Sequence, residues 1–172
     1  MDEGLERTVA ANKAVIGIVM GSASDMSVMS KATEVLIDLG IRYELKVSSA
    51  HRLPELTAEY AKTARDRGIE VIIAGAGMAA HLAGAIAANT TLPVVGVPIK
   101  SGELNGIDAL LSTVQMPSGI PVATVAINGA ANGAFLAASI LSIKYPEIKE
   151  GLDAYRLKTK NILLEKSEEM EK

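Results

Sequence analysis

The chain has 172 residues, of which 49% are hydrophobic and 22% are charged, so we expect one globular domain with a sizeable core. A formal net charge of −3 and only 3% aromatic residues give no support for nucleic-acid binding. The lack of any cysteine excludes disulfides, thiolate catalysis and cysteine-based zinc sites, and it fits an intracellular, cytoplasmic protein.

Two segments have features relevant to targeting or membrane insertion. Residues 1–13 mix charges and lack an apolar core, so we predict an N-terminal extension there and no signal peptide. Residues 71–88 carry only one ionisable side chain, His81, and are long enough for a short membrane span. They begin like a strand, contain three glycines and are rich in alanine, so we predict no membrane association.

Short apolar runs alternate with segments of helical periodicity. Expected strands start every 23 to 29 residues, which is the period of βαβ units. This pattern predicts an α/β protein with a three-layer, doubly wound parallel sheet and flavodoxin-like strand order. The expected strands are residues 14–20, 43–47, 71–74, 94–97 and 122–127, and the expected helices are residues 28–39, 54–67, 79–88, 107–115 and 131–144.

The C-terminal part follows a different pattern. Pro146 interrupts the last helix, so we divide the chain into an α/β catalytic domain, residues 14–145, and a C-terminal helix with a charged tail, residues 146–172. Leu152, Tyr155, Thr159 and Ile162 recur at steps of three and four residues. That stripe predicts packing either on the chain's own domain or on a neighbouring subunit.

The turn after the second expected strand contains the most reactive side chains. Ser49, His51 and Arg52 follow the apolar run at once, and Pro54 is suited to the first turn of a helix. Ligands of open α/β sheets bind at this edge, and imidazole titrates near neutral pH while guanidinium suits phosphate or carboxylate. Taken alone, the turn is equally compatible with a solvated His–Arg pair.

The turn after the first strand offers Ser22, Ser24 and Asp25 at a helix N-terminus. Hydroxyls and free backbone N–H groups there suit an anion, and the carboxylate suits ribose hydroxyls. The alternative is ordinary helix capping, since serine and aspartate are preferred N-cap residues. A P-loop is excluded because no Gly-Lys-Ser/Thr sequence follows.

The turn after the third strand, residues 75–81, matches G-x-G-x-x-A. A dinucleotide cofactor is disfavoured because no acidic residue occurs between Glu70 and Glu103 to hold its ribose. Both histidines of the chain lie in these turns, but without paired carboxylates they predict no metal site. The turn after the fourth strand carries polar side chains to which the sequence assigns no role, namely Lys100, Ser101, Glu103 and Asn105. The turn after the fifth strand, residues 128–132, consists of small and polar residues.

Five motifs in a fixed order make the chain resemble a known family. They are VMGSASD at residues 19–25, SAHR at 49–52, AGAG and AAHL within 74–82, GVP at 96–98, and STVQMP at 112–117. From about residue 14 to residue 155, the chain resembles the catalytic subunits of phosphoribosylaminoimidazole carboxylase, the N5-carboxyaminoimidazole ribonucleotide mutases of purine biosynthesis.

The resemblance implies a role for each matching residue. His51 is implied to be the general acid and base, while carboxylate moves from N5 to ring carbon C4 through released CO₂. The implied partners are a ribonucleotide substrate and further copies of the chain, forming a homo-octamer with sites between subunits; ATP, metal and biotin are not required. The implied substrate-binding residues are Ser22, Ser24, Ser49 and Arg52 for phosphate, Asp25 for ribose, and Ala76, Gly77 and His81 for the aminoimidazole.

The chain departs from the family pattern at three places. Met78 replaces a glycine, Ala83 replaces a proline, and the loop at residues 128–129 is about two residues short. Met78 either narrows the CO₂ pocket or covers the loop from outside. These changes leave direct carboxylation of aminoimidazole ribonucleotide with CO₂ open as an alternative, although the Ser-Ala-His-Lys and Gly-Arg-Ser-Asn signatures of that branch are absent. A non-enzymatic nucleotide-binding module is a further alternative, since a fold does not imply a function.

Overall fold

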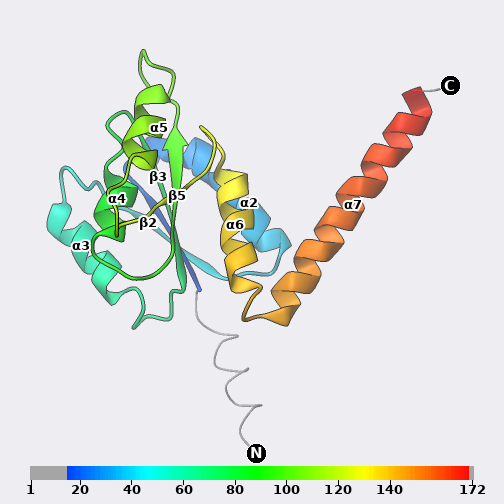
Figure 1. Ribbon diagram of the computed structural model, residues 1–172, viewed down its shortest axis with the longest axis horizontal. Helices are drawn as coiled ribbons and strands as arrows, with labels where there is room; N and C mark the ends of the chain where they lie inside the picture. Colours follow the sequence, from blue (N-terminus) through cyan, green and yellow to red (C-terminus); the bar gives the residue numbers. More distant parts are fainter. Residues whose placement is uncertain (1–14, 171–172) are drawn as a thin grey trace, which may run out of the picture.

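The computed structural model describes residues 15–170, so the extension expected at residues 1–13 lies outside the described part. These residues form strands and helices in regular alternation, as Figure 1 shows. The strands are β1 (Ile16–Met20), β2 (Tyr43–Val47), β3 (Val71–Gly77), β4 (Val94–Ile99) and β5 (Ala123–Thr124). The helices are η1 (Ala23–Asp25), α2 (Met26–Asp38), α3 (Pro54–Thr63), α4 (Leu82–Ala87), α5 (Ile107–Val114), α6 (Ala130–Leu141) and α7 (Pro146–Met170).

The five strands make one parallel sheet in the order β2-β1-β3-β4-β5. This is the flavodoxin-like order, and it confirms the predicted fold class. The chain runs from β1 outward to β2 and then crosses to the other side of β1 to form β3. The strand order therefore reverses between β1 and β3, and this switch point is where open α/β sheets bind ligands.

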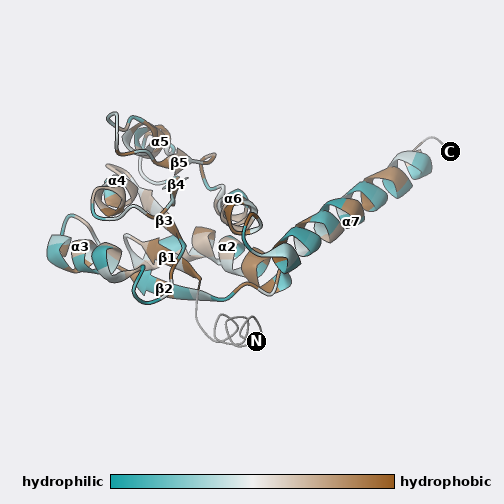
Figure 2. Cartoon of the chain, turned by 60° about the horizontal axis from the view of Figure 1, so that its bottom comes forward, coloured by the Kyte–Doolittle hydropathy of each residue, from teal (hydrophilic) through white to brown (hydrophobic). Residues whose placement is uncertain are grey.

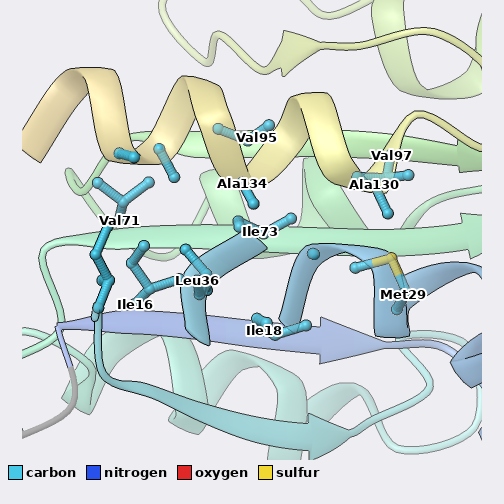
Figure 3. Close-up of a cluster of buried hydrophobic side chains, with 14 of the residues drawn as sticks. Ile16, Ile18, Met29, Leu36, Val71, Ile73, Val95, Val97, Ala130 and Ala134 are labelled. Atoms are coloured by element: carbon cyan, nitrogen blue, oxygen red, sulfur yellow. The ribbon is translucent and has the colours of Figure 1, made fainter. Parts of the chain in front are cut away.

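Helices cover both faces of the sheet, with α2 and α6 on one face and α3, α4 and α5 on the other (Figure 2). Alternate residues of each central strand enter opposite cores, since successive side chains of a strand point to opposite faces. Ile18 and Ile73 pack with α2 and α6, as Figure 3 shows, whereas Val19 and Ile72 belong to the cluster under α3 and α4. Burial on both faces explains the continuous apolar runs.

Two predicted elements are shorter than expected. The strand predicted at residues 122–127 is reduced to β5, because the chain beside β4 contains one extra residue. The Val125 N–H donates to the Gly96 carbonyl, and the Asn128 N–H donates to the Pro98 carbonyl. Three residues after β5 therefore span the same distance as two residues of β4, and the regular strand pairing ends there.

The helix predicted at residues 79–88 begins only at Leu82. The preceding turn is held by short-range hydrogen bonds, from Ala80 N–H to the Met78 carbonyl at 2.8 Å and from His81 N–H to the Ala79 carbonyl at 2.7 Å. Met78 itself has a positive φ of 54°. These conformations are incompatible with an α-helix, so α4 starts one turn later than its sequence pattern predicted.

Helix α7 begins at Pro146 and projects away from the sheet (Figures 1 and 2). Ile148 and Leu152 are buried in the core under α2 and α6, and the Tyr155 ring contacts Phe135 at a centroid distance of 4.5 Å. The helix beyond Tyr155 is exposed. Within residues 15–170, no helix has both the length and the apolar character needed to cross a membrane.

Candidate active site

Three of the predicted turns meet at one edge of the sheet. β1 lies between β2 and β3, and its last residue, Met20, is in register with Val47 on one side and Gly75 on the other. The pairing continues beyond the strand, because Ser48 N–H donates to the Met20 carbonyl and Gly21 N–H to the Gly75 carbonyl. The segments that carry the predicted site residues are therefore neighbours at the switch point.

The two histidines come together across this edge. The rings of His51 and His81 stack with centroids 5.2 Å apart and an interplanar angle of 27°. They belong to the turns after β2 and β3, and both side chains are exposed. A ligand at the switch point therefore meets two adjacent imidazoles, whose ring nitrogens are suited to hydrogen bonding.

The turn that carries His51 is held by buried hydroxyls. Ser48, only 1% exposed, has its Oγ 2.8 Å from Thr57 Oγ1 in α3, and that hydroxyl also donates to the Leu53 carbonyl. Pro54 opens α3 as predicted. The structure thus gives Ser48 and Thr57 a positioning role that their sequence pattern did not reveal, because both are ordinary polar residues near a turn.

Arg52 and Ser49 form a pair on the exposed side of the same turn. Arg52 Nε donates to Ser49 Oγ over 3.3 Å, and Arg52 N–H donates to the Ser49 carbonyl. Nε is one of three nitrogens in the Arg52 guanidinium. The other two, at the end of the side chain, are suited to bidentate binding of an anion. A hydroxyl and a guanidinium at this position are suitable ligands for phosphate.

The first turn is a capping structure that also presents polar groups. Ser22 is the N-cap of η1, and Asp25 Oδ2 accepts the Ser22 N–H over 3.0 Å, which makes a capping box. Ser24 Oγ donates to Ser22 Oγ over 2.9 Å on the surface. Partial burial raises the pKa of Asp25, although hydrogen bonds from the Ser22 and Gly21 backbone act in the opposite direction. The capping alternative is therefore present in the structure, and the two hydroxyls still lie at the ligand edge.

The third turn is pinned to the fourth by Ser101. Its Oγ accepts the Met78 N–H over 3.0 Å and lies so near Gly77 that a Cβ there would overlap it. The Lys100 N–H in turn donates to Asn128 Oδ1 over 2.8 Å, which joins the fourth turn to the fifth. The sequence indicated Ser101 only as a polar turn residue, because nothing local predicts which backbone group it binds.

Side chains of the predicted site form hydrogen bonds within their own turns. Among the hydrogen bonds of residues 15–170, none joins the side chains of the first turn to those of the second, so a ligand would have to bridge them. No group of three or more His, Asp or Glu side chains suited to a metal ion occurs in this described part. The arrangement is chemically a set of hydroxyl and guanidinium donors, which suit an anion, beside two stacked imidazoles.

The strand order defines the doubly wound α/β class, and the candidate site lies at its topological switch point. The family model for AIR carboxylase matches residues 15–161, and the chain belongs to this family. The resemblance inferred from the five motifs is thereby confirmed.

Relatives and solved structures agree with this assignment. The chain is 67% identical over 141 residues to the N5-carboxyaminoimidazole ribonucleotide mutase of Pyrococcus abyssi, covering 82% of this chain and 81% of that protein. It is 58% identical over 156 residues to the mutase of Thermotoga maritima, covering 91% of each. The crystal structure of Treponema denticola PurE matches with a TM-score of 0.84 at 29% identity, covering 93% of this chain and all of that one.

Proposed function

We propose that this chain converts N5-carboxyaminoimidazole ribonucleotide to 4-carboxy-5-aminoimidazole ribonucleotide in purine biosynthesis. The structural observation that carries the proposal is the meeting of an anion-binding pair, Ser49 and Arg52, with the stacked imidazoles of His51 and His81 at the switch point. The names of the Pyrococcus and Thermotoga relatives support the same activity.

The substrate would be held by three turns. Ser22, Ser24, Ser49 and Arg52 would bind its phosphate, since hydroxyls and guanidinium are strong donors to phosphate oxygens. Asp25 would accept hydrogen bonds from the ribose hydroxyls. The aminoimidazole would lie against the backbone of Ala76 and Gly77 and beside His81, where a glycine permits close approach.

The reaction would proceed in two balanced steps with His51 as the proton carrier. First the bond between N5 and the carboxylate carbon breaks, CO₂ is released, the electron pair stays on N5, and N5 takes a proton from His51. The ring carbon C4 then attacks CO₂, and its proton returns to His51. One imidazole serves both steps, and such transfers contribute about 10²- to 10⁴-fold to rate. No electron is gained or lost, so the steps need no redox partner, and the resemblance to the family implies that no ATP is used.

The assembly is also a proposal. The apolar side chains of α7 beyond Tyr155 have no cover within residues 15–170, and a second copy of the chain would bury them. We propose a homo-oligomer in which α7 packs on a neighbouring subunit. The octameric state and the cytoplasmic location expected from the sequence stay predictions.

Turnover of synthetic N5-carboxyaminoimidazole ribonucleotide tests the activity directly. We expect the purified chain to form the C4-carboxylated product, and His51→Asn to lower kcat by about 10²- to 10⁴-fold because no proton carrier remains. Glu55→Gln, an exposed change in the first turn of α3, is the matched control and should retain activity.

Two results would contradict the proposal. One is a wild-type chain that forms no C4-carboxylated product, and the other is full activity in His51→Asn. A parallel assay supplies aminoimidazole ribonucleotide and bicarbonate in place of the carbamate. Saturable turnover there, without turnover of the carbamate, would establish direct carboxylation instead.

A further inference from the structure

Met78 has a backbone conformation that is unusual for its residue type. Its φ of 54° lies in the left-handed region, which glycine adopts freely and a side chain disfavours. The residue is 62% exposed, so burial of the side chain in the core does not compensate for the strain. Strained residues of this kind cluster at functional sites, where the surrounding structure holds them in place.

The surrounding turns hold Met78 from both sides. Its N–H donates to Ser101 Oγ over 3.0 Å, and its carbonyl accepts the Ala80 N–H over 2.8 Å. The preceding residue, Gly77, is confined by close approach of Ser101, and Ser101 follows Lys100, which is anchored to Asn128. The Met78 backbone is therefore built rigidly into the ligand edge, while its side chain stays uncovered.

Met78 lies in the turn after β3, which is the turn proposed to hold the aminoimidazole ring. In the sequence it lies one residue after Gly77, proposed to lie against the aminoimidazole, and three residues before His81, whose ring stacks on His51. Leu53 and Leu104 are also exposed apolar residues in turns at this edge, but neither belongs to the turn proposed to hold the ring. The other proposed side chains of the site are hydroxyls, a carboxylate, a guanidinium and imidazoles, all of which attract water.

We propose that Met78 is a substrate-binding residue that forms an apolar wall against the released CO₂ and keeps it from exchanging with solvent. This inference rests on the mutase activity proposed above. CO₂ is uncharged and has no hydrogen-bond donor, so a flexible, polarisable thioether suits it better than a hydroxyl or a charge. The wall acts after the N5–carboxylate bond has broken and before the C4–carboxylate bond forms, and it changes no atom or electron balance.

An isotope-retention experiment on the full chain tests the wall. Carbamate substrate labelled with ¹³C in its carboxylate is turned over in excess unlabelled bicarbonate, and the label in the C4-carboxylated product is measured by mass spectrometry. We expect wild type to retain most of the label, and Met78→Gly to lose it severalfold more often and to accumulate uncarboxylated ribonucleotide. Met78→Leu keeps the apolar bulk and should restore retention to near the wild-type value.

The outcomes separate this inference from the activity on which it rests. A wild-type chain that does not turn over the carbamate overturns the proposed function itself. A wild-type chain that is active but exchanges its label completely, or a Met78→Gly variant that retains label as wild type does, overturns the wall. Loss of folding is not expected for Met78→Gly, because glycine relieves the strain, and a melting temperature at or above that of wild type verifies this.

Discussion

Asp25 shows how one side chain serves both the fold and a proposed ligand. Its carboxylate caps η1 by accepting the Ser22 N–H, and the same residue stands at the ligand edge next to β1. Partial burial raises its pKa, so the ionised form is less favourable in the folded chain than in the unfolded one. The ionised carboxylate therefore lowers the free energy of unfolding at neutral pH. The same ionised group is the one suited to accept hydrogen bonds from ribose hydroxyls.

This linkage predicts the behaviour of Asp25→Asn. Between the unfolded and folded pKa values the folded state binds more protons, so Asp25 reduces stability progressively as pH rises from about 4, near the unfolded value. The asparagine amide oxygen can still accept the Ser22 N–H but does not ionise. We expect Asp25→Asn to melt at a higher temperature than wild type at pH 7, with the difference vanishing near pH 4.

Thermal unfolding followed by circular dichroism at a series of pH values measures this difference. If Asp25→Asn instead melts below wild type at pH 7 and approaches it at low pH, the Asp25 carboxylate stabilises the folded chain. That result would contradict the direction of the pKa shift.

At the scale of elements, the packing of α3 on the sheet depends on Gly17 in β1. A Cβ at this glycine would overlap the hydroxyl of Tyr60 in α3 and approach Ile69 to 3.6 Å. The Tyr60 hydroxyl is buried and makes no hydrogen bond of ordinary geometry within residues 15–170, although burial and the nearby Glu44 carboxylate raise its pKa. The ring stacks under the Arg67 guanidinium at 4.6 Å, and Arg67 binds Glu44 of the edge strand β2. This contact sets how closely α3, and with it the turn that carries His51, can approach the sheet.

The predicted consequence is a non-additive pair of substitutions. Gly17→Ala should destabilise the chain by about 1–3 kcal/mol through overpacking. Tyr60→Phe should lie between neutral and about 1 kcal/mol stabilising, because it removes a buried hydroxyl without a partner. The double variant should be more stable than the sum of the single effects. Urea denaturation of all four chains gives the coupling energy, and strict additivity would show that the hydroxyl is not the obstacle.

At the scale of the whole molecule, α7 has two distinct halves. The first half buries Ile148 and Leu152 against the domain, and Lys144 and Tyr145, which directly precede the helix, both bind Glu70. The second half exposes apolar side chains on a projecting helix, namely Leu157, Ile162, Leu163 and Leu164. The sequence stripe allowed packing on the same domain or on another subunit, and only the first half packs on its own domain.

The exposed half predicts how self-association responds to charge. Ile162→Glu should lower the molar mass measured by multi-angle light scattering, because a carboxylate is costly to bury in an apolar interface. Lys158→Glu is the matched control, since it changes charge on the same helix without removing an apolar side chain. An unchanged mass for Ile162→Glu, or a wild-type chain that is a monomer, would contradict assembly through α7.

The sequence by itself determined the fold class and the family. Runs of Val, Ile and Ala long enough only for strands buried on both faces, separated by helical segments that end in glycine, leave few arrangements besides a doubly wound sheet. The motifs at the strand ends could also be identified from the sequence, because the residues of each turn are consecutive in the chain.

Only the tertiary structure decided which turns share contacts. His51 and His81 are 30 residues apart, and Met78 and Ser101 are 23 apart, so no local pattern records that they meet. They meet because parallel strands in the order β2-β1-β3-β4 bring their carboxyl ends to one edge. The shortening of β5 and the delayed start of α4 likewise depend on hydrogen bonds to other segments or on a strained turn, and propensity alone does not contain that information.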